Sequence, residues 1–147
     1  MRAIVQRVQE AQVSVAGVII GTIGPGLLIF VAIHRGDSER EARKLCDKIL
    51  RLRIFADSDG KMNCDILQTQ GSLLIVSQFT LYGDTSKGNR PSYSEAASSE
   101  KAQDLYDLFV KLCRNECSNV QTGQFQAHMQ IHLVNDGPVT LLCQAES

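Results

Sequence analysis

The sequence predicts an α+β fold in which an antiparallel or mixed β-sheet curls toward a barrel and is covered by two main helices. Short apolar runs of strand length, separated by turn residues, recur along the 147-residue chain. Only two stretches repeat apolar residues at helical spacing, and each lies between strand patterns. Such helices must cross over the sheet and bury their apolar faces on it. With no linker or repeat, one domain is expected over residues 1–147.

The first third of the chain predicts a meander of about four short strands. Residues 2–8 and 11–20 mix β-branched with polar residues, and glycines follow at position 21 and within residues 24–26. Residues 27–34 are continuously apolar, which predicts a strand buried on both faces.

Each predicted helix begins at a capping signal. Ser38 and Glu41 fit a capping box, and apolar residues then recur at helical spacing. The polar face of this helix is basic, which favours a solvated surface over a phosphate-binding one. Ser92 with Glu95 predicts the cap of a second amphipathic helix over residues 96–117.

The remaining strands follow from turn signals and apolar runs. Asp59-Gly60 between two short apolar runs predicts a hairpin. Residues 72–76 predict another buried strand, and residues 125–134 and 139–143 complete the sheet.

Composition excludes some functions. The chain has 15 basic and 16 acidic residues, a balance that argues against coating nucleic acid non-specifically but permits a local basic patch. Aromatic residues are sparse and Trp is absent, which disfavours a stacking platform for single strands.

Cysteine and histidine positions predict neither a metal nor a cofactor. The five cysteines form no Cys-x-x-Cys pair and read as free thiols in a reducing compartment. Cys113 and Cys117 lie one helical turn apart, where buried packing is the favoured use. His128 and His132 are too widely spaced on a predicted strand to define a metal site.

The expected location is cytoplasmic. No stretch approaches the roughly 18–20 apolar residues that a membrane span needs, and the first residues enter a strand pattern without the form of a signal peptide.

Two stretches carry groups that could do chemistry. Residues 77–80 (Ser-Gln-Phe-Thr) place two hydroxyls and an amide where a buried strand ends. Residues 135–140 (Asn-Asp-Gly-Pro-Val-Thr) interrupt an alternating apolar pattern. Since proline cannot donate to a ladder, Gly137-Pro138 must either separate two strands or form a bend that presents bare backbone. Considered alone, both stretches favour ordinary turns, with Ser and Thr bonding local backbone in the first.

Together, residues 77–81 and 135–140 resemble the two signature motifs of the D-aminoacyl-tRNA deacylases, also called D-tyrosyl-tRNA deacylases. Residues 1–8, residues 53–55 with 60–63, and residues 88–92 resemble further blocks of that family, so the likeness covers essentially the whole chain. Gln126 and His128 depart from the expected pattern, which bears on pocket shape and substrate preference.

The resemblance implies a homodimer that hydrolyses the ester between a D-amino acid and tRNA, accepting glycine as well. It implies that the Gly137-Pro138 bond is cis and that its carbonyls enter the partner subunit's pocket. A backbone filter of this kind accepts many D-residues and excludes L-residues by steric clash. Arg7 is the candidate for holding the motif by hydrogen bonds.

Two catalytic hypotheses follow from the resemblance. In one, Thr80 is a covalent nucleophile, although the sequence offers no general base for it. In the favoured one, backbone N–H groups near Phe79 and Thr80 hold the oxyanion, Ser77 and Gln78 position the substrate, and water attacks with help from the ribose 2′-hydroxyl.

Binding roles extend to four more residues. Ala127 and Met129 are expected on the adenosine side of the pocket, and Lys87 and Arg90 at acceptor-stem phosphates. The alternative function is a non-catalytic nucleic-acid-binding module on the same scaffold.

Overall fold

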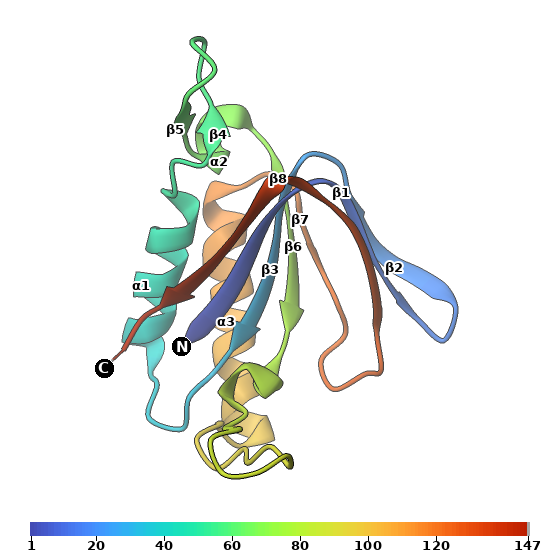
Figure 1. Cartoon of the computed structure of the whole chain (residues 1–147), viewed down its shortest axis with the longest axis vertical. Helices are drawn as coiled ribbons and strands as arrows, with labels where there is room; N and C mark the ends of the chain where they lie inside the picture. The colour runs from blue at the N-terminus through green and yellow to red at the C-terminus, as the bar shows by residue number, and fades with distance from the viewer. Residues whose placement is uncertain (147) are drawn as a thin grey trace.

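The computed structural model describes residues 1–146, which form a six-stranded mixed sheet, a two-stranded sheet and three α-helices (Figure 1). In chain order the elements are β1 Arg2–Val15, β2 Val18–Ile23, β3 Gly26–Ala32, α1 Glu39–Leu50, β4 Phe55–Ala56, β5 Met62–Cys64, α2 Ile66–Thr69, β6 Ser72–Ser77, the 3-10 helix η1 Phe79–Tyr82, α3 Ser99–Glu116, β7 Val120–Thr122 and β8 Gln130–Gln144. No helix among these residues is long and apolar enough to cross a membrane.

Strand β1 is the centre of the sheet. It pairs with β2 and β3 along one edge and with β8 along the other, always antiparallel. Ala11 of β1 pairs with Ile23 of β2, and Val8 of β1 pairs with Gly26 of β3 in the same register. Strands β2 and β3 therefore follow the same side of β1, with a break only at residues 24–25. Strands β3, β6 and β7 are parallel neighbours, as helical crossovers require. The predicted mixed sheet is therefore confirmed.

The predicted four-strand meander was wrong in its boundaries. Residues 9–10 were expected to separate two strands, but β1 runs through them. They lie between the part of β1 that pairs with β3 and the part that pairs with β2, and their polar side chains are exposed there. The break falls instead inside the predicted strand 11–20, where Ala16 and Gly17 have positive φ angles of 49° and 79°. Such angles suit the two-residue turn of the β1–β2 hairpin.

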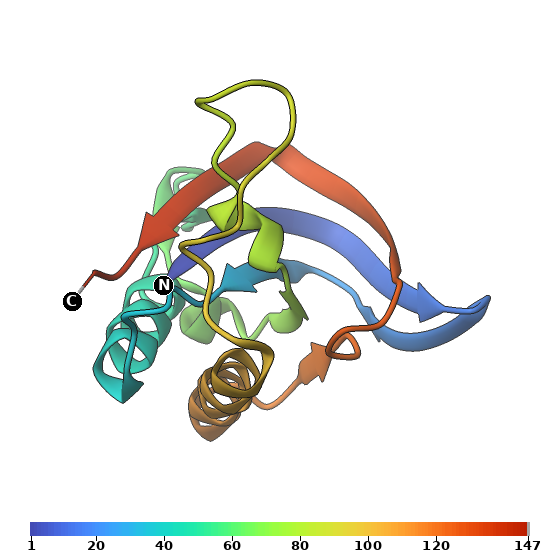
Figure 2. The same ribbon diagram turned by 90° about the horizontal axis from the view of Figure 1, so that it is seen from below.

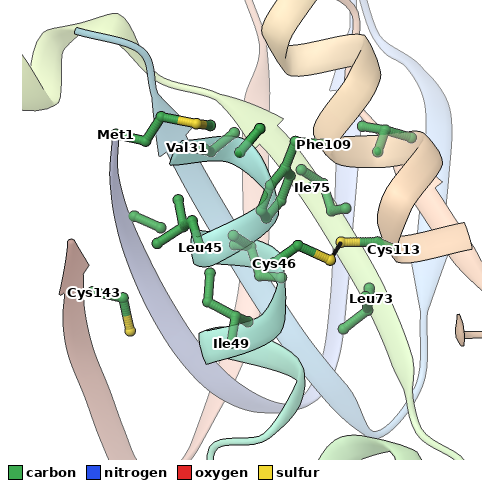
Figure 3. Packing of buried hydrophobic residues seen from close by; sticks show 14 of the residues in the cluster. Met1, Val31, Leu45, Cys46, Ile49, Leu73, Ile75, Phe109, Cys113 and Cys143 are labelled. Atoms are coloured by element: carbon green, nitrogen blue, oxygen red, sulfur yellow. Dashed lines mark hydrogen bonds between the residues drawn. The ribbon is translucent and has the colours of Figure 1, made fainter. Parts of the chain in front are cut away.

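The main core lies between the sheet and the two long helices. Figure 2 shows α1 and α3 on the same side of the curved sheet. Figure 3 shows Leu45 and Ile49 of α1, Phe109 of α3 and Ile75 of β6, which belong to one buried cluster. The core also holds free thiols: the Cys46 and Cys113 sulfur atoms are 3.7 Å apart, and Cys117 and Cys143 are buried as well. Packing, as predicted, is the use made of Cys113 and Cys117.

A second, smaller core lies where the sheet curls over itself. Its buried members are Val8, Ala11, Val13, Ile23, Leu28, Leu74 and Val76. Met129, Ile131 and Leu133, from β8 and the residue before it, pack against this cluster. The curled sheet thus encloses apolar residues of its own and is nearly closed.

The helix signals were right at one helix and wrong at the other. Ser38 and Glu41 form the predicted capping box of α1. Helix α3, however, begins at Ser99 with Ser98 as its N-cap, and not near Ser92. Glu95 cannot cap it, because its carboxylate bonds His34 Nε2 (2.9 Å) and its backbone oxygen accepts from the Arg35 N–H (3.0 Å), both in the segment after β3.

The predicted β4–β5 hairpin is present, but the C-terminal strands differ from expectation. Residues 125–129 lie outside β8, which starts at Gln130. From there β8 runs without a turn through the predicted break, so that residues 130–134 and 139–143 belong to one strand. The sheet continues because β1 pairs with β8 on both sides of the break.

Candidate active site

A cleft of about 890 Å³ opens where β3 and β6 end and α3 begins. One wall carries Ser77, Gln78 and Phe79, and the facing wall carries Ala127 and Met129. Five residues that the sequence singled out from two separate stretches therefore line a single cleft.

The first wall is positioned by the buried strand β6. The Gln78 N–H donates to the Val31 carbonyl (2.8 Å), which extends the β3–β6 ladder past the end of β6. The chain then turns into η1, whose first N–H groups, on Phe79 and Thr80, have no acceptor within the helix. The Gln78 side-chain nitrogen donates to the exposed Thr80 hydroxyl. The backbone here presents two adjacent donors held by a rigid strand.

Phe79 is a large apolar side chain that the fold leaves 54% exposed. Its ring meets the ring of Tyr93 edge to face, with centroids 5.1 Å apart. An aromatic ring that is fixed in place but not covered is suited to contact a ligand.

The facing wall is a turn between β7 and β8. Gln126, at a positive φ of 64°, donates from its side chain to the Ser99 hydroxyl (2.7 Å) and ties the turn to the start of α3. Met129 reaches back so closely that its sulfur lies 2.6 Å from where a Cβ on Gly123 would stand. His128 also lines the cleft. The departures noted at Gln126 and His128 thus lie in the wall itself.

The cleft lining carries no charged side chain. Apart from His128 and Tyr93, its polar groups are hydroxyls, amides and backbone. A carboxylate base for activating a Thr80 nucleophile is therefore not part of the lining. The neutral surroundings favour recognition and stabilisation by hydrogen bonds.

The second motif forms a bulge in β8. Val8 pairs with Asn135 and Gln6 with Thr140, so residues 136–139 are left outside the ladder. The bond between Gly137 and Pro138 is cis, and both residues are exposed. Of the two possibilities that the sequence left open, the structure has the bend that presents bare backbone.

Two side chains clamp the base of this bulge. The Arg7 Nε donates to the Asp136 carbonyl (3.1 Å), and an Arg7 terminal nitrogen donates to the Ile54 carbonyl (2.5 Å). The Asn135 amide donates to the carbonyls of Arg7 (2.9 Å) and Val139 (3.0 Å). These bonds fix the chain on both sides of Gly137-Pro138 while leaving the motif itself uncovered.

The two motifs do not meet within one chain. Arg7, Gly137 and Pro138 are absent from the cleft lining. Lys87 and Arg90 are exposed in the loop that follows η1 and do not line the cleft either. One chain therefore brings together Ser77, Gln78, Phe79, Ala127 and Met129, with Thr80 next to them on η1.

Sequence reasoning missed part of the cleft wall. Tyr93, Phe125 and residues 96–99 line it, and residues 96–99 fall inside the predicted helix of residues 96–117. The sequence of residues 96–99, Ala-Ala-Ser-Ser, was the available signal, because four small side chains in a row where a helix begins leave room for a ligand.

Comparison with known proteins identifies the family of the chain. The family model described as D-Tyr-tRNA(Tyr) deacylase matches residues 4–144. A protein of Escherichia coli O81 named D-aminoacyl-tRNA deacylase is 51% identical over 144 residues, covering 98% of this chain and 99% of its own length. A protein of the same name from Salmonella newport has the same identity and coverage.

Two solved structures share the fold. One, described as c-Myc DNA Unwinding Element Binding Protein, has a TM-score of 0.95 and 37% identity, with 100% of both chains covered. The other, described as a probable eukaryotic D-amino acid tRNA deacylase, has a TM-score of 0.82 and 18% identity over 97% of each chain, a likeness of fold alone. With the family model matching nearly its whole length, the chain belongs to the D-Tyr-tRNA(Tyr) deacylase family.

Proposed function

We propose that this protein hydrolyses the ester that joins a D-amino acid to the terminal ribose of tRNA, releasing free tRNA and the D-amino acid. The observation that carries the proposal is the exposed Gly137-Pro138 backbone, clamped by Arg7 and Asn135 but remote from its own cleft. The curated relatives named D-aminoacyl-tRNA deacylase supply the reaction.

The proposed working unit is a homodimer. Each subunit contributes a cleft, and its partner contributes the carbonyls of Gly137-Pro138 to that cleft. Backbone groups cannot be tuned to one side chain, so such a filter accepts many D-residues and excludes an L side chain by steric clash. Glycine has no side chain to exclude, and glycyl-tRNA is therefore also expected to be a substrate.

In the proposed reaction, water adds to the ester carbonyl and the ribose oxygen leaves with a proton, aided by the neighbouring 2′-hydroxyl. The N–H groups of Phe79 and Thr80 hold the oxyanion that develops, and Ser77 and Gln78 position the substrate. Two observations support this route over a Thr80 nucleophile, because a hydroxyl nucleophile needs an adjacent base. No carboxylate lines the described cleft, and the Thr80 hydroxyl is bonded to the Gln78 amide, which is not a base. The steps proposed here require neither a metal nor a cofactor.

The tRNA end is proposed to lie along the cleft. Ala127 and Met129 would face the terminal adenosine. Lys87 and Arg90, exposed beyond η1, would meet acceptor-stem phosphates, contacts that set register and carry no sequence information.

The test compares hydrolysis of D-tyrosyl-tRNA and L-tyrosyl-tRNA by the wild type and by Pro138→Ala. We expect the wild type to release only D-tyrosine, and the variant to lose activity or chiral selectivity while keeping its melting temperature. Gly17→Ala, on the exposed β1–β2 turn, serves as the control and should leave selectivity unchanged. Equal release of both isomers by the wild type would contradict the backbone filter.

A second candidate function is nucleic-acid binding without catalysis. It is favoured by one observation, the 37% identical neighbour described as a DNA unwinding element binding protein. The net charge of −1 weighs against it. It would take first place if the protein left D-aminoacyl esters intact yet bound nucleic acid with a steep salt dependence.

A further inference from the structure

We infer that Arg2 is a positioning residue for the reaction: it holds the far end of η1 and thereby keeps the N–H groups of Phe79 and Thr80 aimed at the cleft. The inference rests on the function proposed above, since it assigns a task to the helix that carries those N–H groups. Arg2 lies at the start of β1 and outside the cleft lining.

Helix η1 needs anchors at both ends. It has four residues, far fewer than a helix needs to persist on its own. Its entry is fixed, because Gln78 continues the ladder with Val31. Its exit runs directly into the exposed loop of residues 84–91, which is closed by pairing of Asp84 with Ser92 and not by pairing with a strand of the sheet.

Arg2 supplies the anchor at the exit. A terminal guanidinium nitrogen donates to the Leu81 carbonyl (3.3 Å), one of the last carbonyls of η1. The guanidinium carbon also lies 4.6 Å from the centroid of the Tyr82 ring, in cation–π geometry. A cation at the C-terminal end of a helix is favourable for the free carbonyls there. One side chain thus binds both the backbone and the last residue of η1.

The contact between Arg2 and Tyr82 can fix the end of η1 because Tyr82 is itself held in place by the fold. It is only 7% exposed, and its ring lies 5.3 Å from the His34 ring. The His34 Nδ1 accepts from the Gly36 N–H (3.0 Å), and its Nε2 bonds the Glu95 carboxylate (2.9 Å). The exit of η1 is therefore tied to β1 through Arg2 and to the end of β3 through His34.

Arginine is the residue type this task requires. Its planar guanidinium can lie over a ring and donate to a carbonyl at the same time, which the ammonium of lysine does less well. Arg2→Met keeps most of the apolar stem and removes both contacts. Arg2→Lys keeps the charge and should restore part of the function.

The experiment measures deacylation kinetics and amide hydrogen exchange in the same variants. For Arg2→Met we expect kcat on D-tyrosyl-tRNA to fall by about 10- to 100-fold with KM nearly unchanged, because misplacing a catalytic group by about 1 Å costs up to about 100-fold. Arg2→Lys should fall between Arg2→Met and the wild type. Exchange of the amides in residues 79–83 should speed up in Arg2→Met.

Arg114→Met is the matched control. It removes another arginine-to-carbonyl bond, from Arg114 to Val120 (3.4 Å), at the end of α3 away from the cleft. This variant should leave kcat and the exchange of residues 79–83 unchanged. Tyr82→Phe should also keep wild-type kinetics, because the contact uses the ring and not the hydroxyl.

The outcomes separate this inference from the proposed function. If wild type does not hydrolyse D-tyrosyl-tRNA, the proposed function fails, and exchange alone still tests whether Arg2 holds η1. Unchanged exchange of residues 79–83 in Arg2→Met, or a loss of kcat matched by Arg114→Met at equal melting temperature, would overturn the inference.

Discussion

Arg7 donates through its Nε to the Asp136 carbonyl at 3.1 Å, across the gap that the bulge leaves between β1 and β8. The Arg7 side chain is only 15% exposed, so its place is fixed by the fold. The bond sets the direction of the peptide that enters Gly137. A side chain on the central strand thus orients a backbone motif on the surface.

Replacing Arg7 should therefore impair the filter more than the fold. Arg7→Met removes the bonds to Asp136 and Ile54 but keeps the stem. We expect hydrolysis of D-tyrosyl-tRNA to fall at least about tenfold, since the carbonyls of Gly137-Pro138 lose their fixed direction. Initial rates on D- and L-tyrosyl-tRNA measure this. Wild-type rates and selectivity in a folded Arg7→Met variant would show that the clamp is dispensable.

Gly137→Ala should be more harmful than Gly17→Ala. Both glycines have positive φ, 131° and 79°, so both alanines are strained by about 1–3 kcal/mol. A Cβ on Gly137 would also stand 2.9 Å from Val139 and 3.0 Å from Arg7, whereas one on Gly17 meets nothing within 4 Å. Only Gly137→Ala should therefore lose deacylase activity.

Urea unfolding measures the stability of the two glycine variants, and deacylation rates measure their activity. Equal activity in both would mean that the space around Gly137 has no part in the reaction.

Two phenylalanines should behave in opposite ways. Phe109 is fully buried in the main core, and Phe109→Ala should lower the free energy of unfolding by about 3–5 kcal/mol. Phe79 is half-exposed at the cleft, so Phe79→Ala should cost far less stability and yet slow hydrolysis strongly. Chemical denaturation and single-turnover rates separate the two effects. A fast, fully active Phe79→Ala would remove that ring from the site.

The α1 capping box should make stability depend on acid. The Ser38 hydroxyl and N–H donate to the Glu41 carboxylate and hold the pKa of Glu41 below its ordinary value of 4.5, although burial opposes the shift. A pKa lowered by folding contributes stability above the unfolded value, and this contribution is lost as the pH falls through the folded value.

Glu41→Gln lacks that contribution at every pH. The wild type should therefore be more stable than the variant at pH 7, and the difference should shrink below about pH 4.5. Thermal unfolding of both proteins between pH 7 and pH 3 gives the comparison. A difference that stays constant over this range would mean that the Glu41 charge is not what stabilises the cap.

Local signals in the sequence were reliable where the structure itself is local. The box of Ser38 and Glu41 needs only neighbouring residues, and it is present as predicted. The start of α3 was misplaced because residues 93–97 are tied to the end of β3, a contact that no local pattern reveals. The continuity of β8 was missed for the same reason, since its pairing with β1 overrides the break at Gly137-Pro138.

In the candidate site, too, local features could be predicted from the sequence and features that depend on distant contacts could not. Ser77 to Phe79 could be located because a buried strand ends there. That Ala127 and Met129 face them depends on the crossovers that align β3, β6 and β7, which involve the whole chain. The contribution proposed for a second subunit does not follow from the contacts within one chain.

The most direct test of the account mixes two inactive variants, Phe79→Ala and Gly137→Ala, and measures hydrolysis of D-tyrosyl-tRNA after subunit exchange. If the cleft and the filter come from different subunits, the mixed dimer contains one intact site: the Phe79 of one chain with the Gly137 of the other. We predict that activity returns on mixing, toward a quarter of the wild-type rate when half the molecules are mixed dimers. Two variants that stay inactive after demonstrated exchange would contradict a site shared between subunits.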